Sequence, residues 1–108
     1  MARDADCVVA LCTAPADHSE RLARAVVDER LCACVNVVPQ VRSFFRWEGR
    51  TDVADEQLLV AKTTRAGFAA LRDRLAELHP YDVPEVIALD VAAGLPAYLS
   101  WVVTSVRD

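Results

Sequence analysis

Four cysteines are the side chains of this chain with the widest range of chemistry. All of them fall in the first third of the sequence, at Cys7, Cys12, Cys32 and Cys34. Four cysteines in a secreted protein can form two disulfides, and clustered thiolates can bind zinc. The last two are spaced as Cys-x-Cys, whereas zinc ribbons use Cys-x-x-Cys. Reduced cysteines that pack as small hydrophobic residues are therefore favoured, with a structural zinc site as the alternative.

A second group of side chains suits a small-molecule pocket between subunits. It comprises Trp47, Glu48, Lys62, Tyr81 and Glu85. Lys62 is the single lysine of the chain and ends an apolar segment, and Pro84 stiffens the backbone between Tyr81 and Glu85. Plainer roles stay open, because a strand-end lysine can extend its charged end to water and hairpin aromatics often pack against a neighbouring subunit.

No set of residues indicates catalysis. The three glycines are widely scattered, so no phosphate-binding loop is present. We find no paired nucleophile and base, and no pair of carboxylates at a catalytic spacing. We therefore expect a protein that is not an enzyme and that carries no organic cofactor.

Length and charge exclude several further classes. The 108 residues fit one domain spanning 1–108, and the 54% of hydrophobic residues argue against disorder. A net charge of −4 disfavours binding to nucleic acid, and no segment is apolar for long enough to span a membrane. The N-terminal residues 1–6 carry acids where a signal peptide needs a basic run, so we expect a cytoplasmic protein.

Hydrophobic periodicity predicts the elements that position these residues. We expect strands over 7–13, 33–38, 41–47, 57–63 and 86–91, and helices over 15–31, 68–79 and from Pro96 onward. Pro39 interrupts the second strand, which indicates a bend or bulge there. Gly49 follows an extended aromatic segment and predicts a turn into the third strand.

This order is the α+β, ferredoxin-like βαββαβ pattern with an added C-terminal helix. Right-handed crossovers place strands one and three in the middle and both long helices on one face. The other face is left uncovered, so we expect an oligomer. The same topology brings Cys12 and His79 to one edge of the sheet and leaves the other three cysteines toward the opposite edge.

Several blocks together resemble one family. The chain is similar to the CutA divalent-cation tolerance proteins through Val38–Ser43, Trp47–Gly49, Lys62–Thr64, His79–Glu85 and Gly94–Leu99. The resemblance covers nearly the whole chain in the right order. It implies a ferredoxin-like homotrimer that is similar in architecture to the PII signalling proteins.

The resemblance also implies a metal site. Some family members bind copper through a cysteine that ends strand one and histidines before a Pro-Tyr pair, which correspond here to Cys12 and His79. Leu78 stands where the fullest form of that site has a second histidine. Plainer roles remain open: Cys12 as a core residue, and His79 as a cap on the last turn of its helix.

Three functional hypotheses follow from these residues. The first is a trimeric divalent-cation tolerance protein that binds copper or another transition metal weakly. The second is a PII-like signalling module that senses a small anionic metabolite in the clefts between subunits. The third is a very stable trimeric scaffold whose role lies in contacts with partner proteins.

Overall fold

The computed structural model describes residues 6–107, and it builds one four-stranded sheet with three helices. In chain order the elements are β1 (Cys7–Ala14), α1 (Ala16–Asp28), β2 (Cys34–Trp47), β3 (Arg50–Thr64), α2 (Phe68–Leu78), β4 (Val86–Asp90) and α3 (Pro96–Ser105). The expectation that no export signal is present rests on residues 1–6, of which 1–5 lie outside the described residues.

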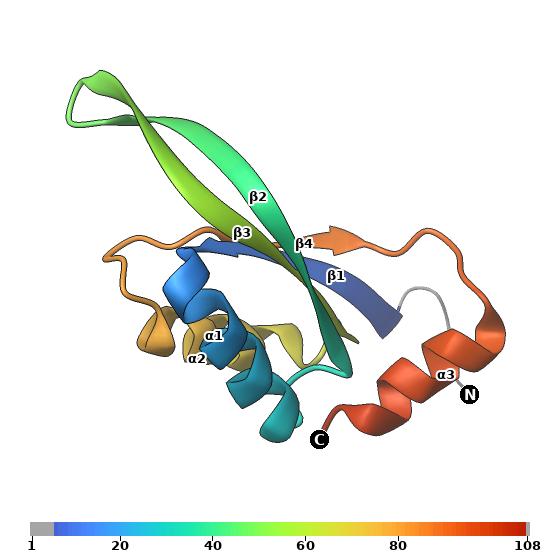
Figure 1. Ribbon diagram of the computed structural model, residues 1–108. Coiled ribbons are helices and arrows are strands. Elements are labelled where there is room, and N and C mark those ends of the chain that lie inside the picture. The colour runs from blue at the N-terminus through green and yellow to red at the C-terminus, as the bar shows by residue number, and fades with distance from the viewer. Residues whose placement is uncertain (1–5, 108) are drawn as a thin grey trace.

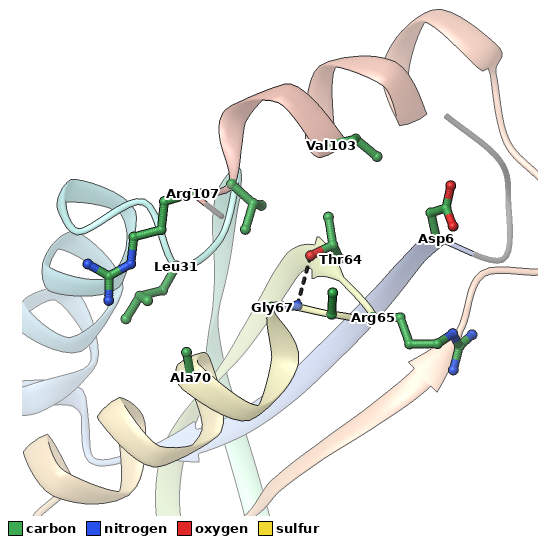
Figure 2. A pocket seen from close by; sticks show the side chains of 10 residues that line it. Asp6, Leu31, Thr64, Arg65, Gly67, Ala70, Val103 and Arg107 are labelled. Carbon is green, nitrogen blue, oxygen red and sulfur yellow. Dashed lines mark hydrogen bonds between the residues drawn. The ribbon is translucent and has the colours of Figure 1, made fainter. Parts of the chain in front are cut away.

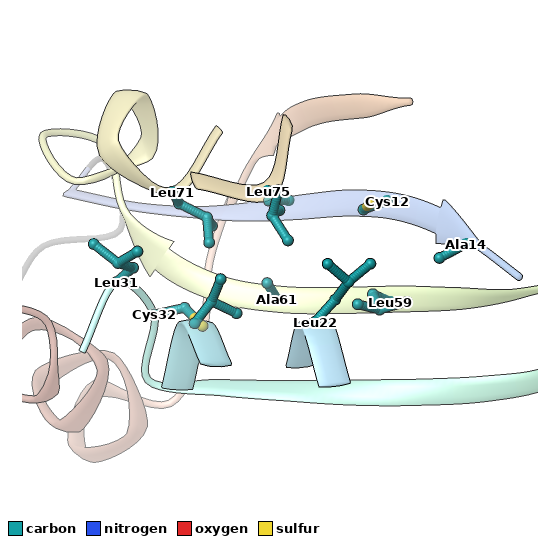
Figure 3. Packing of buried hydrophobic residues seen from close by; sticks show 11 residues of the cluster. Cys12, Ala14, Leu22, Leu31, Cys32, Leu59, Ala61, Leu71 and Leu75 are labelled. Carbon is teal, nitrogen blue, oxygen red and sulfur yellow. The ribbon is translucent and has the colours of Figure 1, made fainter. Parts of the chain in front are cut away.

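The sheet has the predicted ferredoxin-like topology. Its strand order is β2-β3-β1-β4, with β1 antiparallel to both of its neighbours. The helices α1 and α2 lie together on one face of the sheet (Figure 1). Leu22 of α1, Leu71 and Leu75 of α2 and Leu59 of β3 meet between these layers and form the main core (Figure 3). Because β1 and β3 are central, every second residue of each strand points into that core.

The long β2–β3 hairpin extends well beyond the rest of the sheet (Figure 1). The expected irregularity at Pro39 is confirmed, since the β2–β3 register shifts between Val38 and Val41 and Gln40 takes a φ of 62°. The expected turn is confirmed as well. Glu48 and Gly49 both have positive φ, at 49° and 81°, which is the backbone of a type I′ hairpin turn.

The third strand begins seven residues earlier than predicted. The segment before Gln57 is polar and lacks an apolar alternation, so no strand is predicted there. It pairs instead with the aromatic half of β2, from Val41 opposite Glu56 to Trp47 opposite Arg50. Backbone pairing within the hairpin fixes this segment as a strand, because its side chains are mostly solvent-exposed and bury little apolar surface.

The ends of several elements differ by a few residues from the predicted ranges. Pro15 precedes α1 as its N-cap and is not part of the first turn, because its ψ of 148° is not helical. The same helix ends at Asp28, so Leu31 reaches the core from the loop that follows. β4 ends at Asp90, one residue earlier than expected.

The face of the sheet opposite α1 and α2 is largely open. Ile87 and Leu89 of β4 point to this side, and about half of each side chain is exposed, at 49% and 51%. Within residues 6–107, α3 covers one end of this face. There α3 packs beside the start of β1, where Cys7 joins Leu99 and Val102 in a second, smaller cluster.

Candidate functional site

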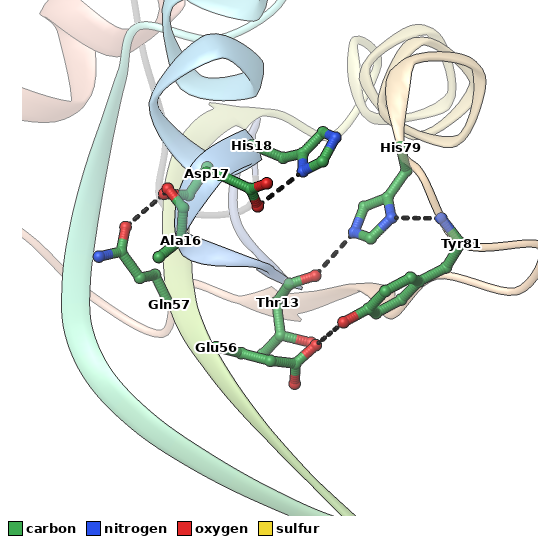
Figure 4. A network of polar contacts seen from close by, with 9 residues as sticks. Thr13, Ala16, Asp17, His18, Glu56, Gln57, His79 and Tyr81 are labelled. Carbon is green, nitrogen blue, oxygen red and sulfur yellow. Dashed lines mark hydrogen bonds and ion pairs between the residues drawn. The ribbon is translucent and has the colours of Figure 1, made fainter.

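A chain of hydrogen bonds links the end of β1 to the segment that follows α2 (Figure 4). His79 Nε2 lies 2.8 Å from the carbonyl oxygen of Thr13, and His79 Nδ1 accepts from the backbone N–H of Tyr81 at 3.1 Å. The Tyr81 hydroxyl donates to Glu56 Oε2 on β3 at 2.9 Å. Three elements that are distant in sequence are thereby joined at one edge of the sheet.

These bonds fix the state of the His79 ring. The Thr13 carbonyl can only accept, so Nε2 carries the proton, and Nδ1 faces an N–H and is the acceptor. His79 is also the C-cap of α2, but its side chain bonds to β1 and does not cap the helix carbonyls, which was the alternative role left open for it. A metal ion at either nitrogen must therefore displace one of these two bonds.

Cys12 lies beside the same carbonyl. Its Sγ is 3.8 Å from the Thr13 oxygen, so the thiol and the His79 Nε2 lie at most 6.6 Å apart. The expected approach of these two residues is confirmed. Cys12 is nevertheless buried in the core, and burial, helped by the charges of Glu85 and Glu56, raises the pKa of its thiol to about 12. At neutral pH the thiol is protonated.

The donor set of this edge is small. Within residues 6–107 no group of three or more histidine, cysteine, aspartate or glutamate side chains is arranged to hold a metal ion. Cys12 and His79 supply one sulfur and one nitrogen, a combination that suits copper(I) or zinc. Binding to both needs the two atoms within about 4.3 Å of each other, given ordinary metal–ligand distances.

A cavity of about 680 Å³ lies next to this network, between the outer part of the hairpin and the segment that precedes β4. It brings together Trp47, Tyr81 and Glu85 of the predicted pocket. Burial, with a smaller contribution from the hydrogen bond to Glu56, raises the pKa of Tyr81 to about 12, so its phenol is neutral. The aromatic and acidic side chains expected at these three positions therefore line one cavity within a single chain.

Two members of the predicted pocket lie elsewhere. Glu48 sits in the hairpin turn and does not line the cavity. Lys62 lies near the far end of β3, opposite Cys34, where its Nζ contacts Asn36 Oδ1. Cys34 in turn lies 3.5 Å from the Tyr98 hydroxyl of α3. The lysine and the acid-lined cavity of one chain therefore belong to opposite ends of the sheet.

Sequence analysis missed three acids of the cavity, Asp52, Glu56 and Asp82. Asp52 and Glu56 lie in the part of β3 that precedes the predicted strand 57–63. Once that part is a strand, alternation places them on the same face as Ser43 and Phe45 of β2. The antiparallel register was therefore the signal that could have found them, but it depends on knowing where the strand begins.

The three other cysteines lie away from Cys12, as expected. Cys7 and Cys34 lie at the opposite end of the strands, beside Thr64 and Lys62 of β3. Nearby, a second cavity of about 620 Å³ lies between the start of α2 and α3 (Figure 2). It contains none of the site residues expected from the sequence.

Fold and site together define a class: an α+β, ferredoxin-like protein whose hydrogen-bonded sheet edge presents a cysteine, a histidine and an aromatic, acidic cavity. The family model of the CutA1 divalent ion tolerance protein matches residues 7–105. The chain therefore belongs to the CutA divalent-cation tolerance family.

Relatives and solved structures agree with this membership. The divalent-cation tolerance protein CutA of Thermus thermophilus is 47% identical over 94 residues, which cover 86% of this chain and 91% of the relative. A solved structure of the Thermus protein superposes with a TM-score of 0.91 and 42% identity, covering 94% of this chain and 99% of that one. A structure titled PII-like protein CutA, from Nostoc, has a TM-score of 0.88 and 36% identity, covering 93% and 97%.

Two facts bear on cellular context. This chain spans about half the length of the mouse and Arabidopsis relatives that it matches, and the Arabidopsis relative is named chloroplastic. Among residues 6–107, none of the helices has the length and apolar character that crossing a membrane requires.

Proposed function

We propose that this protein is a homotrimeric, non-enzymatic member of the divalent-cation tolerance system that binds copper or another soft transition metal weakly at Cys12 and His79. The observation that carries the proposal is the meeting of both side chains at one atom, the Thr13 carbonyl oxygen. A thiolate and an imidazole bound to one ion would replace two contacts to that oxygen. The names of the relatives agree with a role in metal tolerance.

The chemistry of the two side chains accounts for weak binding. A thiol with a pKa of about 12 must lose its proton, and the imidazole must leave the Thr13 carbonyl, before both can bind one ion. Each cost reduces the affinity, and the first makes binding release a proton. We therefore expect copper(I) to bind more tightly as pH rises, until the thiol ionises without metal.

Trimer formation is supported by the uncovered apolar surface. The sheet face that carries Ile87 and Leu89 is exposed in one chain, and so are Phe44 and Trp47 on the hairpin. Apolar patches of this kind on soluble proteins commonly mark contacts between subunits. Burying this surface between three chains would stabilise the fold by mass action.

A competition experiment with a chromogenic copper(I) chelator tests the metal site. We expect the wild-type protein to withdraw copper(I) from the chelator and the His79→Ala variant to withdraw at least tenfold less. His18→Ala is the matched control, because His18 is the other histidine and lies on α1 beside Asp17. Equal loss in both variants, or no loss in His79→Ala, would contradict the site.

The second candidate function is a PII-like signalling module, favoured by the cavity of about 680 Å³ that one chain already forms. The anionic metabolite is expected in the clefts between subunits, and within one chain Lys62 lies away from this cavity. A thermal-shift screen with nucleotides and organic acids tests it. An upward shift that Lys62→Ala abolishes would favour the module. We also propose a cytoplasmic location and, as a third candidate function, a role as a scaffold for partner proteins.

A further inference from the structure

The cavity of about 620 Å³ between α2 and α3 lies apart from the surfaces used so far (Figure 2). It is lined by the start of α2, whereas His79 follows the end of that helix, and about 15 Å of helix separates the two ends. Among the described residues, none of its lining belongs to β2 or β4. The cavity is therefore separate from the proposed metal site and from the sheet face that we place between subunits.

The walls of this cavity are mostly apolar. They consist of Leu31, Ala66, Ala70, Val103 and Val106. Leu31 and Val106 are buried and form fixed walls, whereas the alanines of α2 are exposed. The two helices approach closely at one end, since a Cβ added at Gly67 would lie 3.1 Å from Cγ1 of Val106. Small side chains at the start of α2 thus leave an apolar hollow, with a volume typical of small-molecule sites.

Hydrogen bonds to the loop after α1 hold α3 beside this hollow. The Arg30 guanidinium donates to the carbonyl oxygens of Ser105 at 3.2 Å and Thr104 at 3.4 Å. The backbone N–H of Arg107 donates in return to the carbonyl oxygen of Arg30 at 2.9 Å. The cavity is therefore formed before any ligand binds, which lowers the entropic cost of binding.

The charges at the rim are unequal. Arg107 lies on the side of Leu31, and Asp6 lies on the side of Arg65 (Figure 2). The Arg65 guanidinium is held by Asp90 Oδ1 at 2.7 Å. Within residues 6–107 no acidic side chain forms an ion pair with Arg107, which is exposed. In a chain of net charge −4, the Arg107 side of the rim therefore attracts an anion, and the Asp6 side repels one.

We propose that this cavity binds an amphipathic carboxylate, with its head group at the Arg107 guanidinium and its apolar tail over Ala70, Val103 and Val106. A guanidinium can bind a carboxylate through two parallel hydrogen bonds, and the apolar walls remove the tail from water. Asp6 disfavours a second carboxylate at the far end of the tail. The site requires neither Cys12 nor a metal ion, and it adds an organic ligand to the proposed function.

Three eight-carbon ligands separate the contributions of head group and tail. Calorimetric titration of the full chain would compare octanoate with octylamine, which is cationic, and with octanedioate, which is acidic at both ends. We expect saturable binding of octanoate that weakens as salt is raised, and at least tenfold weaker binding of the other two. A parallel titration with butanoate tests the tail, and we expect weaker binding because less apolar surface is buried.

Two pairs of substitutions supply matched tests. Ala70→Trp fills the cavity, whereas Ala69→Trp adds the same bulk at the neighbouring exposed position of α2, which does not line it. Arg107→Gln removes the rim charge, whereas Arg21→Gln removes an exposed charge of α1 away from the cavity. We expect octanoate affinity to fall at least tenfold in Ala70→Trp, three- to tenfold in Arg107→Gln, and less than twofold in both controls.

Copper(I) competition by Ala70→Trp should match that of the wild-type protein, because the metal site lies at the other end of α2. This readout also shows that the variant is folded, and it separates a failure of the cavity from a failure of the proposed function. Equal binding of octanoate and octylamine, equal effects within either pair of variants, or no saturable binding of octanoate would overturn the proposal.

Discussion

The hydrogen bond between Tyr81 and Glu56 gives the most quantitative test of the site's geometry. The Tyr81→Phe substitution removes the hydroxyl that donates to Glu56 Oε2 at 2.9 Å and leaves the ring in place. Hydrogen bonds to charged groups contribute about 1.5–3 kcal/mol to stability. Glu56 is almost completely buried, but Tyr81 is 38% exposed, so water can replace part of the lost bond. We therefore expect a loss of about 2 kcal/mol in the free energy of unfolding.

Urea denaturation, followed by far-UV circular dichroism at one fixed protomer concentration, would measure this loss. The fixed concentration matters because subunit association adds to apparent stability. Tyr98→Phe is the matched control, since its hydroxyl lies 3.5 Å from the Cys34 thiol, a weak partner. We expect this control to lose less than about 1 kcal/mol, because a thiol contact contributes little.

A double-mutant cycle separates the bond from other effects of the substitution. We expect a coupling energy of about 1–2 kcal/mol between Tyr81→Phe and Glu56→Gln, as for residues in direct contact. The reasoning is refuted if the coupling is below about 0.3 kcal/mol, or if Tyr98→Phe costs as much as Tyr81→Phe. Either result would mean that Tyr81 does not hold the Glu56 carboxylate in solution.

Four further predictions concern thiol reactivity, the pH dependence of stability, the hairpin and assembly. Burial raises the pKa of both Cys12 and Cys32 to about 12. We therefore expect native protein at pH 8 to be alkylated first at Cys34, and peptide mass spectrometry can check this. These two thiols should leave the free energy of unfolding unchanged below pH 9 and lower it as pH rises from 9 toward 12. The reason is that the thiols ionise in this range only in the unfolded chain. Urea denaturation at a series of pH values would measure the fall. Gly49→Ala should cost about 1 kcal/mol in urea denaturation, since its φ of 81° disfavours any side chain; an unchanged midpoint would contradict the turn geometry. Leu89→Lys should shift the proposed trimer toward monomer in sedimentation velocity, because it places a charge on the open apolar face. An assembly that the substitution leaves unaltered would exclude that face from the interface.

Much of the fold follows from the sequence because local patterns and topology rules agree. The apolar stripe of α2 ends at Leu78, before Pro80, and the structure ends the helix there. The positions of Pro39 and Gly49 marked the bulge and the turn correctly. The outer part of β3 could not be predicted in this way, since residues 50–56 carry no apolar period and owe their extended form to pairing with β2.

The candidate site was predictable only in part for a related reason. Cys12 and His79 were expected at one sheet edge because β1 and β4 pair in this topology, and the Thr13 carbonyl joins them. Sequence spacing could not reveal that the same carbonyl already forms a hydrogen bond with the imidazole, or that the thiol faces the core. The pocket set had a similar limit. Lys62 was grouped by its residue type, whereas position along β3 separates it from Tyr81.

The proposed metal site is tested most directly by the X-ray absorption spectrum of the protein loaded with one equivalent of copper(I). The account predicts one sulfur and at least one nitrogen around copper in the wild-type protein. It also predicts that the sulfur signal is lost in Cys12→Ser and kept in Cys34→Ser, the control that removes the most exposed thiol. Sulfur that persists in Cys12→Ser, or that disappears in Cys34→Ser, would contradict metal binding at Cys12 and His79.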